Sequence, residues 1–178
     1  MPIPDVIATE RVFDGKLIGV RVDTLSNPAG APYTREIVEY DRAVVLVPVD
    51  ADGRLLMVRQ YRHPARAWLL ELPAGGVDAH DASSEDAAQR ELREETGYRG
   101  TITRIGGMYL APGYSEEYQY IYAATDLAED ALEADEDEEL LLERVTLDDA
   151  LRKIDADEIR DAKSIAALLM YLRHIGRA

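Results

Sequence analysis

The sequence contains no cysteine and has far fewer positive than negative side chains. Without cysteine, disulfide bonds and thiol chemistry are excluded. Its 178 residues include 20 lysine and arginine residues against 35 aspartate and glutamate residues, so the formal net charge is −15. Because nucleic acids and anionic membrane surfaces bind basic patches, this charge balance argues against both as partners.

Long apolar stretches and targeting signals are also missing. No apolar run approaches the length needed to cross a membrane, and the start lacks the basic segment and apolar core of a signal peptide. We therefore expect no membrane partner and a cytoplasmic location. What is present is a hydrophobic share of 47%, which at this length is enough to bury a sizeable core.

The first forty residues have the pattern of short antiparallel strands. A turn signal at residues 14–15 separates two apolar runs, and residues 33–40 form a third candidate strand. We therefore expect a small antiparallel sheet over residues 1–40 and a main domain over residues 41–178. Because so short a sheet would expose its strand edges, we expect a homodimer with this sheet at the interface.

Two strands are predicted at the start of the main domain. Residues 43–49 form a continuous apolar run, which is typical of a central buried strand, and residues 55–62 return after a turn. The second strand ends at Arg62, a positive charge in a strongly acidic chain. Such a charge suits a phosphate or carboxylate ligand, and it suits a salt bridge at a strand end equally well.

An acidic helix is predicted between Ser83 and Gly97. Ser83 and Asp86 form a weakened capping box, and Gly97 stands where a helix usually ends. Glu91 and Glu95 are four residues apart, so their carboxylates project from one face of the helix. Carboxylates grouped in this way suit hard divalent cations, although a solvated acidic surface is the ordinary alternative.

The last part of the chain has the pattern of two helices. A capping box at residues 146–149 predicts a short helix. The apolar face of the last helix is predicted from Ile165, Leu168, Leu169 and Leu172. We expect both helices to be structural.

The spacing of glycine, arginine and glutamate around the acidic helix resembles the Nudix hydrolase signature. The matching residues are Gly76, Arg90, Glu91, Leu92, Glu94, Glu95 and Gly97. Two positions depart from the signature: Ala82 replaces an isolated glutamate, and Tyr98 replaces a final aliphatic residue. Asp81 and Glu85 are the candidates to substitute for the missing acid.

This resemblance implies an α+β fold, in which a mixed β-sheet core is sandwiched between helices. It also implies hydrolysis of a nucleoside diphosphate linked to another group, with Mg²⁺ as cofactor and Mn²⁺ as a substitute. The segments 71–75 and 111–117 resemble those of the ADP-ribose pyrophosphatase group. On that basis the substrate is a small nucleotide, ADP-ribose, and the products are AMP and ribose 5-phosphate. Other nucleoside diphosphate sugars stay open as further substrates.

The resemblance also implies roles for individual residues. The metal ligands are the Ala74 carbonyl and the Glu91 and Glu95 carboxylates. The residues assigned to substrate binding are Arg35, Arg62, Glu71, Pro112, Gly113 and Glu117.

Catalysis also requires a base that takes a proton from the attacking water. The resemblance places this base in an acidic loop, where Glu136 is the first candidate and Glu138 the second. Arg90 and Glu94 complete the expected catalytic group. Two other functions stay open: hydrolysis of oxidised deoxynucleotides or dinucleoside polyphosphates, and a catalytically silent module that binds nucleotide.

Overall fold

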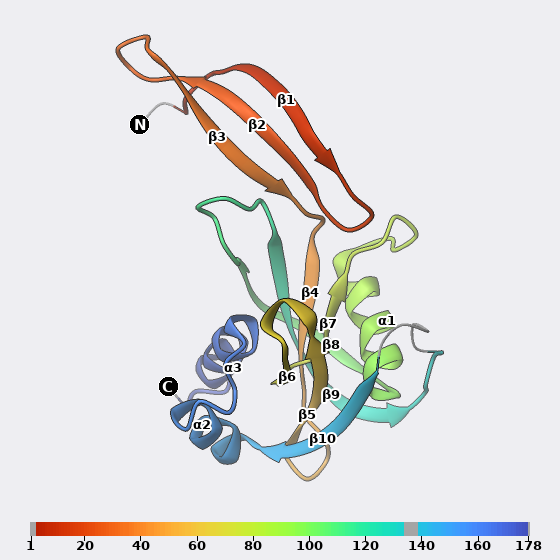
Figure 1. Ribbon diagram of the computed structural model, residues 1–178. Helices are drawn as coiled ribbons and strands as arrows, with labels where there is room; N and C mark the ends of the chain where they lie inside the picture. Colours follow the sequence, from red (N-terminus) through yellow and green to blue (C-terminus); the bar gives the residue numbers. More distant parts are fainter. Residues whose placement is uncertain (1–2, 134–138, 178) are drawn as a thin grey trace. The chain divides into compact units, whose positions relative to one another are not determined.

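The computed structural model describes residues 3–133 and 139–177. The chain divides into two compact units, which are described separately (Figure 1). Unit 1 consists of Met1–Arg42 and Tyr109–Tyr118, and unit 2 consists of Ala43–Met108 and Gln119–Ala178. Within the described residues, no helix combines the length and the apolar content needed to cross a lipid bilayer.

Unit 1 contains an antiparallel sheet with strand order β1-β2-β3. The strands are β1 (Val6–Asp14), β2 (Gly19–Ser26) and β3 (Pro32–Glu39). Asp14 pairs with Gly19 across the first turn, so the hairpin predicted from the turn signal is present. The later segment of the unit joins this sheet because the Val38 N–H donates to the Tyr114 carbonyl over 2.7 Å.

Unit 2 contains two sheets, with strand orders β7-β4-β9-β8 and β10-β5-β6. The strands are β4 (Ala43–Pro48), β5 (Arg54–Arg62), β6 (Ala67–Glu71), β7 (Ala74–Gly76), β8 (Tyr98–Tyr109), β9 (Tyr118–Glu129) and β10 (Leu140–Thr146), and a 3-10 turn η1 (His63–Ala65) lies between β5 and β6. β4 runs parallel to β9 and antiparallel to β7, so the sheet is mixed. Every residue of β4 is buried, which confirms the predicted central strand.

Helices cover both sides of this core: α1 (Ser84–Thr96) on one side, and α2 (Leu147–Asp155) and α3 (Ala162–His174) on the other (Figure 1). Successive residues of β4 face opposite sides, as the pleat of a strand requires. Val44 and Leu46 pack in the cluster that contains α1, whereas Val45 and Val47 pack in the cluster that contains α2 and α3. The expected mixed sheet between helices is therefore confirmed.

The ends of α1 follow the local signals of the sequence. The Ser83 hydroxyl accepts a hydrogen bond from the Asp86 N–H, which satisfies one of the unpaired donors of the first turn. Gly97 adopts a left-handed conformation with φ of 79°, and its N–H donates to the Arg93 carbonyl. Because only glycine adopts this conformation readily, the helix ends there.

The prediction for the face of α3 was wrong at one position. Leu168 and Leu172 are buried, but Leu169 is 51% exposed. The buried stripe of α3 passes through Ala167, Leu168, Tyr171 and Leu172, and Leu169 lies about 100° beyond Leu168, outside this stripe. The buried face instead includes two polar residues, Lys163 and Ser164.

Candidate functional site

Strand β7 and helix α1 bring three predicted metal ligands together. The Ala74 N–H donates a hydrogen bond to Glu95 Oε2 over 3.1 Å. At the next residue, a Cβ added to Gly75 would lie 2.2 Å from the carboxylate of Glu91, so only glycine permits this approach. Glu91 is only 8% exposed. Two carboxylates from one helical face thus contact successive residues of one short strand.

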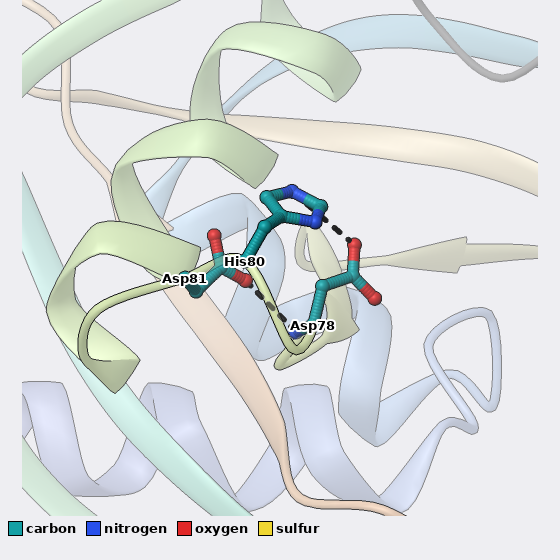
Figure 2. Close-up of side chains that lie close together, drawn as sticks. All are labelled: Asp78, His80 and Asp81. Carbon is teal, nitrogen blue, oxygen red and sulfur yellow. Dashed lines mark hydrogen bonds and ion pairs between the residues drawn. The ribbon is translucent and has the colours of Figure 1, made fainter.

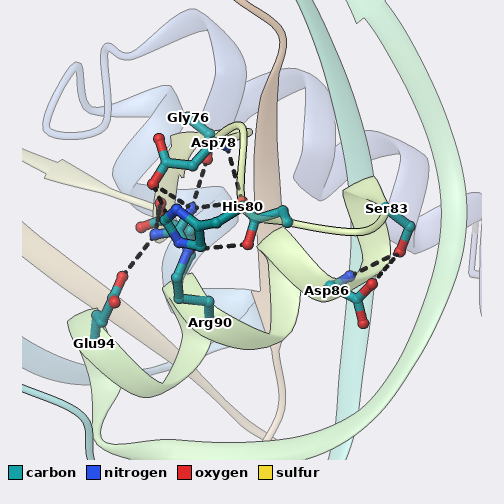
Figure 3. Close-up of polar contacts among 9 residues, drawn as sticks. Gly76, Asp78, His80, Ser83, Asp86, Arg90 and Glu94 are labelled. Carbon is teal, nitrogen blue, oxygen red and sulfur yellow. Dashed lines mark hydrogen bonds and ion pairs between the residues drawn. The ribbon is translucent and has the colours of Figure 1, made fainter.

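Arg90 connects β7 to two acids of α1, Glu91 and Glu94 (Figure 3). Its Nη1 donates to Glu91 Oε1 over 2.7 Å and to Glu94 Oε2 over 2.8 Å. Its Nη2 donates to the Gly76 carbonyl over 2.8 Å. The guanidinium therefore fixes the orientation of Glu91 relative to the backbone that precedes the helix.

Asp81 also binds Arg90, with two hydrogen bonds. Arg90 Nε donates to Oδ1 over 3.2 Å and Nη2 donates to Oδ2 over 3.0 Å. The hydrogen bonds from Arg90 lower the pKa of the Asp81 carboxyl, and burial opposes them only in part. Ala82 and Glu85 are exposed. Of the two acids considered as substitutes for the missing glutamate, Asp81 is the one that contacts the arginine.

The charges around Arg90 do not balance. We use the name Arg90 cluster for Arg90 and the four carboxylates that pair with it, those of Asp78, Asp81, Glu91 and Glu94. Burial lowers the pKa of the guanidinium, but the carboxylates outweigh this effect and raise it above its ordinary value. One permanent positive charge thus faces four negative charges, a surplus that suits a divalent cation.

A second group with metal-ligand chemistry lies in the loop before α1 (Figure 2). The ligand atoms of Asp78, His80 and Asp81 lie within 4.8 Å of one another. However, His80 is 71% exposed at its side chain, and both aspartates pair with Arg90. Because Arg90 also pairs with Glu91 and Glu94, its charge does not distinguish this group from the carboxylates on α1.

Arg62 and Glu71 form a salt bridge between β5 and β6. Arg62 Nε donates to Glu71 Oε1 over 3.0 Å, and Nη2 donates to Oε2 over 2.8 Å. Glu71 is 1% exposed. Burial lowers the pKa of Arg62, while Glu71 and the more distant charges of Glu95 and Asp161 raise it. The salt bridge that the sequence allowed is present, and Arg62 lies within electrostatic range of a predicted metal ligand.

The residues that contact Glu71 from α3 were not predicted from the sequence. Lys163 on α3 contacts Glu71 and donates a hydrogen bond to Asp161 Oδ2 over 2.8 Å. We use the name Lys163 network for the four charged residues Arg62, Glu71, Lys163 and Asp161. The burial of Lys163 could have been predicted from the sequence. Lys163 precedes Ala167 and Tyr171 by four and eight residues, so it lies on the same buried face of the helix.

The remaining candidates that the structure describes lie in unit 1. Arg35 is exposed and its Cζ lies 4.6 Å from the ring centroid of Tyr33. Pro112 and Gly113 are exposed, and the Glu117 N–H donates to Ser115 Oγ over 3.2 Å.

The two candidate bases, Glu136 and Glu138, lie outside the described residues. The assigned roles of all site residues stay predictions.

A model of the NUDIX domain matches residues 39–168, which is more than half of the chain. The chain belongs to the Nudix family. The Nudix signature and the contacts of α1 with β7 thus lie inside the matched region, and the family predicted from the signature is confirmed.

Known proteins are similar to this one over nearly the whole chain. The ADP-ribose pyrophosphatase of Bacillus subtilis strain 168 is 38% identical over 165 residues, which cover 91% of this chain and 89% of the relative. The methanol dehydrogenase activator of Bacillus methanolicus is 34% identical with the same coverage. A crystal structure of an ADP compounds hydrolase matches with a TM-score of 0.88 at 27% identity, over 100% of this chain and 98% of the other.

Proposed function

We propose that this Nudix protein hydrolyses the pyrophosphate bond of ADP-ribose to AMP and ribose 5-phosphate. The observation that carries the proposal is the contact of Glu91 and Glu95 with the Ala74–Gly75 backbone. The relative that is named an ADP-ribose pyrophosphatase supports the choice of substrate.

The donor atoms present fit a magnesium ion. Glu91, Glu95 and the Ala74 carbonyl offer oxygen ligands, which hard divalent cations prefer, and Mn²⁺ accepts the same ligands. The surplus of carboxylates in the Arg90 cluster adds the charge that such an ion requires. When bound, the metal neutralises charge on the pyrophosphate and makes a coordinated water more acidic.

In this proposal, side chains of the protein orient the metal ligand, bind the substrate and accept the proton. Arg90 holds the Glu91 carboxylate in position for the metal. Glu71 holds Arg62 through Nε and Nη2, and we assign the guanidinium to direct contact with a phosphate of the substrate. A loop carboxylate, Glu136 or alternatively Glu138, takes the proton of the attacking water.

An assay across a panel of substrates tests the proposal. The panel contains ADP-ribose, GDP-mannose, a dinucleoside polyphosphate and an oxidised dGTP, each with Mg²⁺ and with a chelator. We expect the highest kcat/KM for ADP-ribose, with release of AMP that stops on chelation. A preference for oxidised dGTP would favour the first alternative, and nucleotide binding without any product would favour the silent module.

We also propose that the protein is a homodimer that uses the sheet of unit 1. The edge strand β1 exposes more than half of Val6, Ile7, Val12 and Phe13. Apolar side chains gathered on an exposed strand favour association with a second copy. Light scattering at micromolar concentration should give twice the mass of one chain, and the mass of a single chain would refute the dimer. The cytoplasmic location and the division after residue 40 stay predictions.

A further inference from the structure

A chain of four charges, of which Glu71 and Lys163 are buried, crosses unit 2 from the end of β5 to the first turn of α3. Arg62 pairs with Glu71, Glu71 pairs with Lys163, and Lys163 pairs with Asp161. The side chains of Glu71 and Lys163 are 1% and 8% exposed. A single charge at such a depth would be costly, so each charged residue of the network depends on its partners.

The network also holds the backbone that leads to the metal ligands. The Ser164 hydroxyl accepts a hydrogen bond from the Leu72 N–H over 2.7 Å and donates one to Asp161 Oδ2 over 2.6 Å. Leu72 follows Glu71 directly and lies two residues before Ala74. The start of α3 therefore binds this segment twice: Lys163 contacts the Glu71 side chain, and Ser164 accepts from the Leu72 amide.

The other side of the segment is bound by β4 and α1. The Leu46 N–H donates to the Pro73 carbonyl over 2.9 Å, and the Ala74 N–H donates to Glu95. Four successive residues, 71–74, are thus fixed by three different elements. A shift of α3 at its first turn would move the Ala74 carbonyl relative to the Glu91 and Glu95 carboxylates.

We infer that Lys163, supported by Asp161 and Ser164, is a positioning residue for the metal site, although it lies on a helix that carries no ligand. Its ammonium group fixes Glu71, and through Glu71 it fixes both Arg62 and the segment that ends at Ala74. Buried ion pairs add little net stability. A role in positioning the segment therefore accounts for the two cations and two carboxylates of the network better than a role in stabilising the fold. The inference rests on the metal site of the proposed function.

The test measures metal affinity without substrate. Free Mn²⁺ is followed by its electron paramagnetic resonance signal during titration of the wild type, Lys163→Met and Lys163→Arg. Loss of a group that orients a metal ligand typically weakens metal binding by about 10- to 100-fold. We expect at least about a tenfold loss for Lys163→Met and substantial recovery for Lys163→Arg, which restores the charge.

Lys153→Met is the matched control, because Lys153 is also a helical lysine paired with a glutamate, Glu158, but on α2. We expect its Mn²⁺ affinity to stay within about twofold of the wild type. Circular dichroism shows which variants are folded at the temperature of the titration. If Lys163→Met does not fold, Ser164→Ala takes its place, and it too should weaken Mn²⁺ binding because Leu72 loses its acceptor.

Wild-type Mn²⁺ affinity in a folded Lys163→Met, or in Ser164→Ala, would overturn the inference. This outcome leaves the proposed substrate untouched, since the titration contains none. Conversely, a wild-type protein that binds Mn²⁺ but leaves ADP-ribose intact contradicts the proposed function, and the Lys163 titration still decides the positioning role.

Discussion

Two groups of charged residues in unit 2 differ in their balance. The Arg90 cluster sets one cation against four carboxylates, whereas the Lys163 network sets two cations against two carboxylates. A group with surplus negative charge still attracts a cation, and a balanced group does not. The difference supports the proposals that the Arg90 cluster serves a metal and that the Lys163 network holds backbone and side chains in place.

In the proposed function the Arg90 cluster supports a metal ion, and the base is a carboxylate of the acidic loop. We expect Glu136→Gln to lower kcat by about 10²- to 10⁴-fold with little change in substrate affinity, because the base acts in the transition state. Steady-state kinetics at saturating Mg²⁺ measures this effect. Glu133→Gln is the control and should stay near the wild type. A loss in Glu138→Gln instead would keep the mechanism and change the residue.

The next largest effect should come from a direct metal ligand. Glu95→Gln keeps the size and helix propensity of the residue but removes a ligand charge. Since groups that only support a ligand already contribute about 10- to 100-fold, we expect kcat to fall by at least about 100-fold at saturating Mg²⁺. Circular dichroism should show an intact fold. Turnover within a few-fold of the wild type would contradict the assignment of Glu95 as a metal ligand.

Asp81 tests whether the Arg90 cluster needs its orienting acid. Asp81→Ala removes two hydrogen bonds to Arg90, so we expect Mn²⁺ affinity to weaken by about tenfold. The double variant Asp81→Ala with Ala82→Glu offers a carboxylate one residue later, at the position that the family signature uses. Partial recovery in the double variant would show that Asp81 replaces the missing glutamate. Equal affinity of Asp81→Ala and the wild type would argue that it does not.

The smallest effect concerns the Lys163 network and pH. Burial raises the pKa of Asp161, but the charge and hydrogen bond of Lys163 outweigh it, so the pKa lies below its ordinary value. Asp161 therefore stabilises the fold above its ordinary pKa of about 3.9, and this contribution is lost as pH falls through the lower folded value. Urea unfolding should find Asp161→Asn less stable by about 1 kcal/mol at pH 7. The difference should shrink below pH 4, and a constant difference would contradict the prediction.

Local features of the chain were predictable because their causes lie within a few residues. The Ser83 cap, the end of α1 at Gly97 and the shared face of Glu91 and Glu95 follow from helix geometry alone. The buried strand over residues 43–48 follows from its apolar run. The role of Glu91 and Glu95 as metal ligands came from the resemblance to the Nudix signature, and it stays a prediction.

Choices between equivalent partners needed the tertiary structure. Asp81 and Glu85 were equal candidates in the sequence, and only the path of the loop decides that Asp81 meets Arg90. Leu169 has the composition of a core residue, but its direction on α3 exposes it. Two adjacent leucines on a helix point in directions about 100° apart, and the sequence alone does not show which of them faces the core.

The sequence by itself determined the family, the helix that carries the acids and the spacing of those acids. These features could be predicted because the signature, the helix and the spacing all involve residues that are close in the chain. Only the tertiary structure decided that Lys163 meets Glu71, a partner 92 residues away. The cost of isolating a charge in the core makes such pairs obligatory. Their partners are chosen by how helices pack on sheets, which no local pattern encodes.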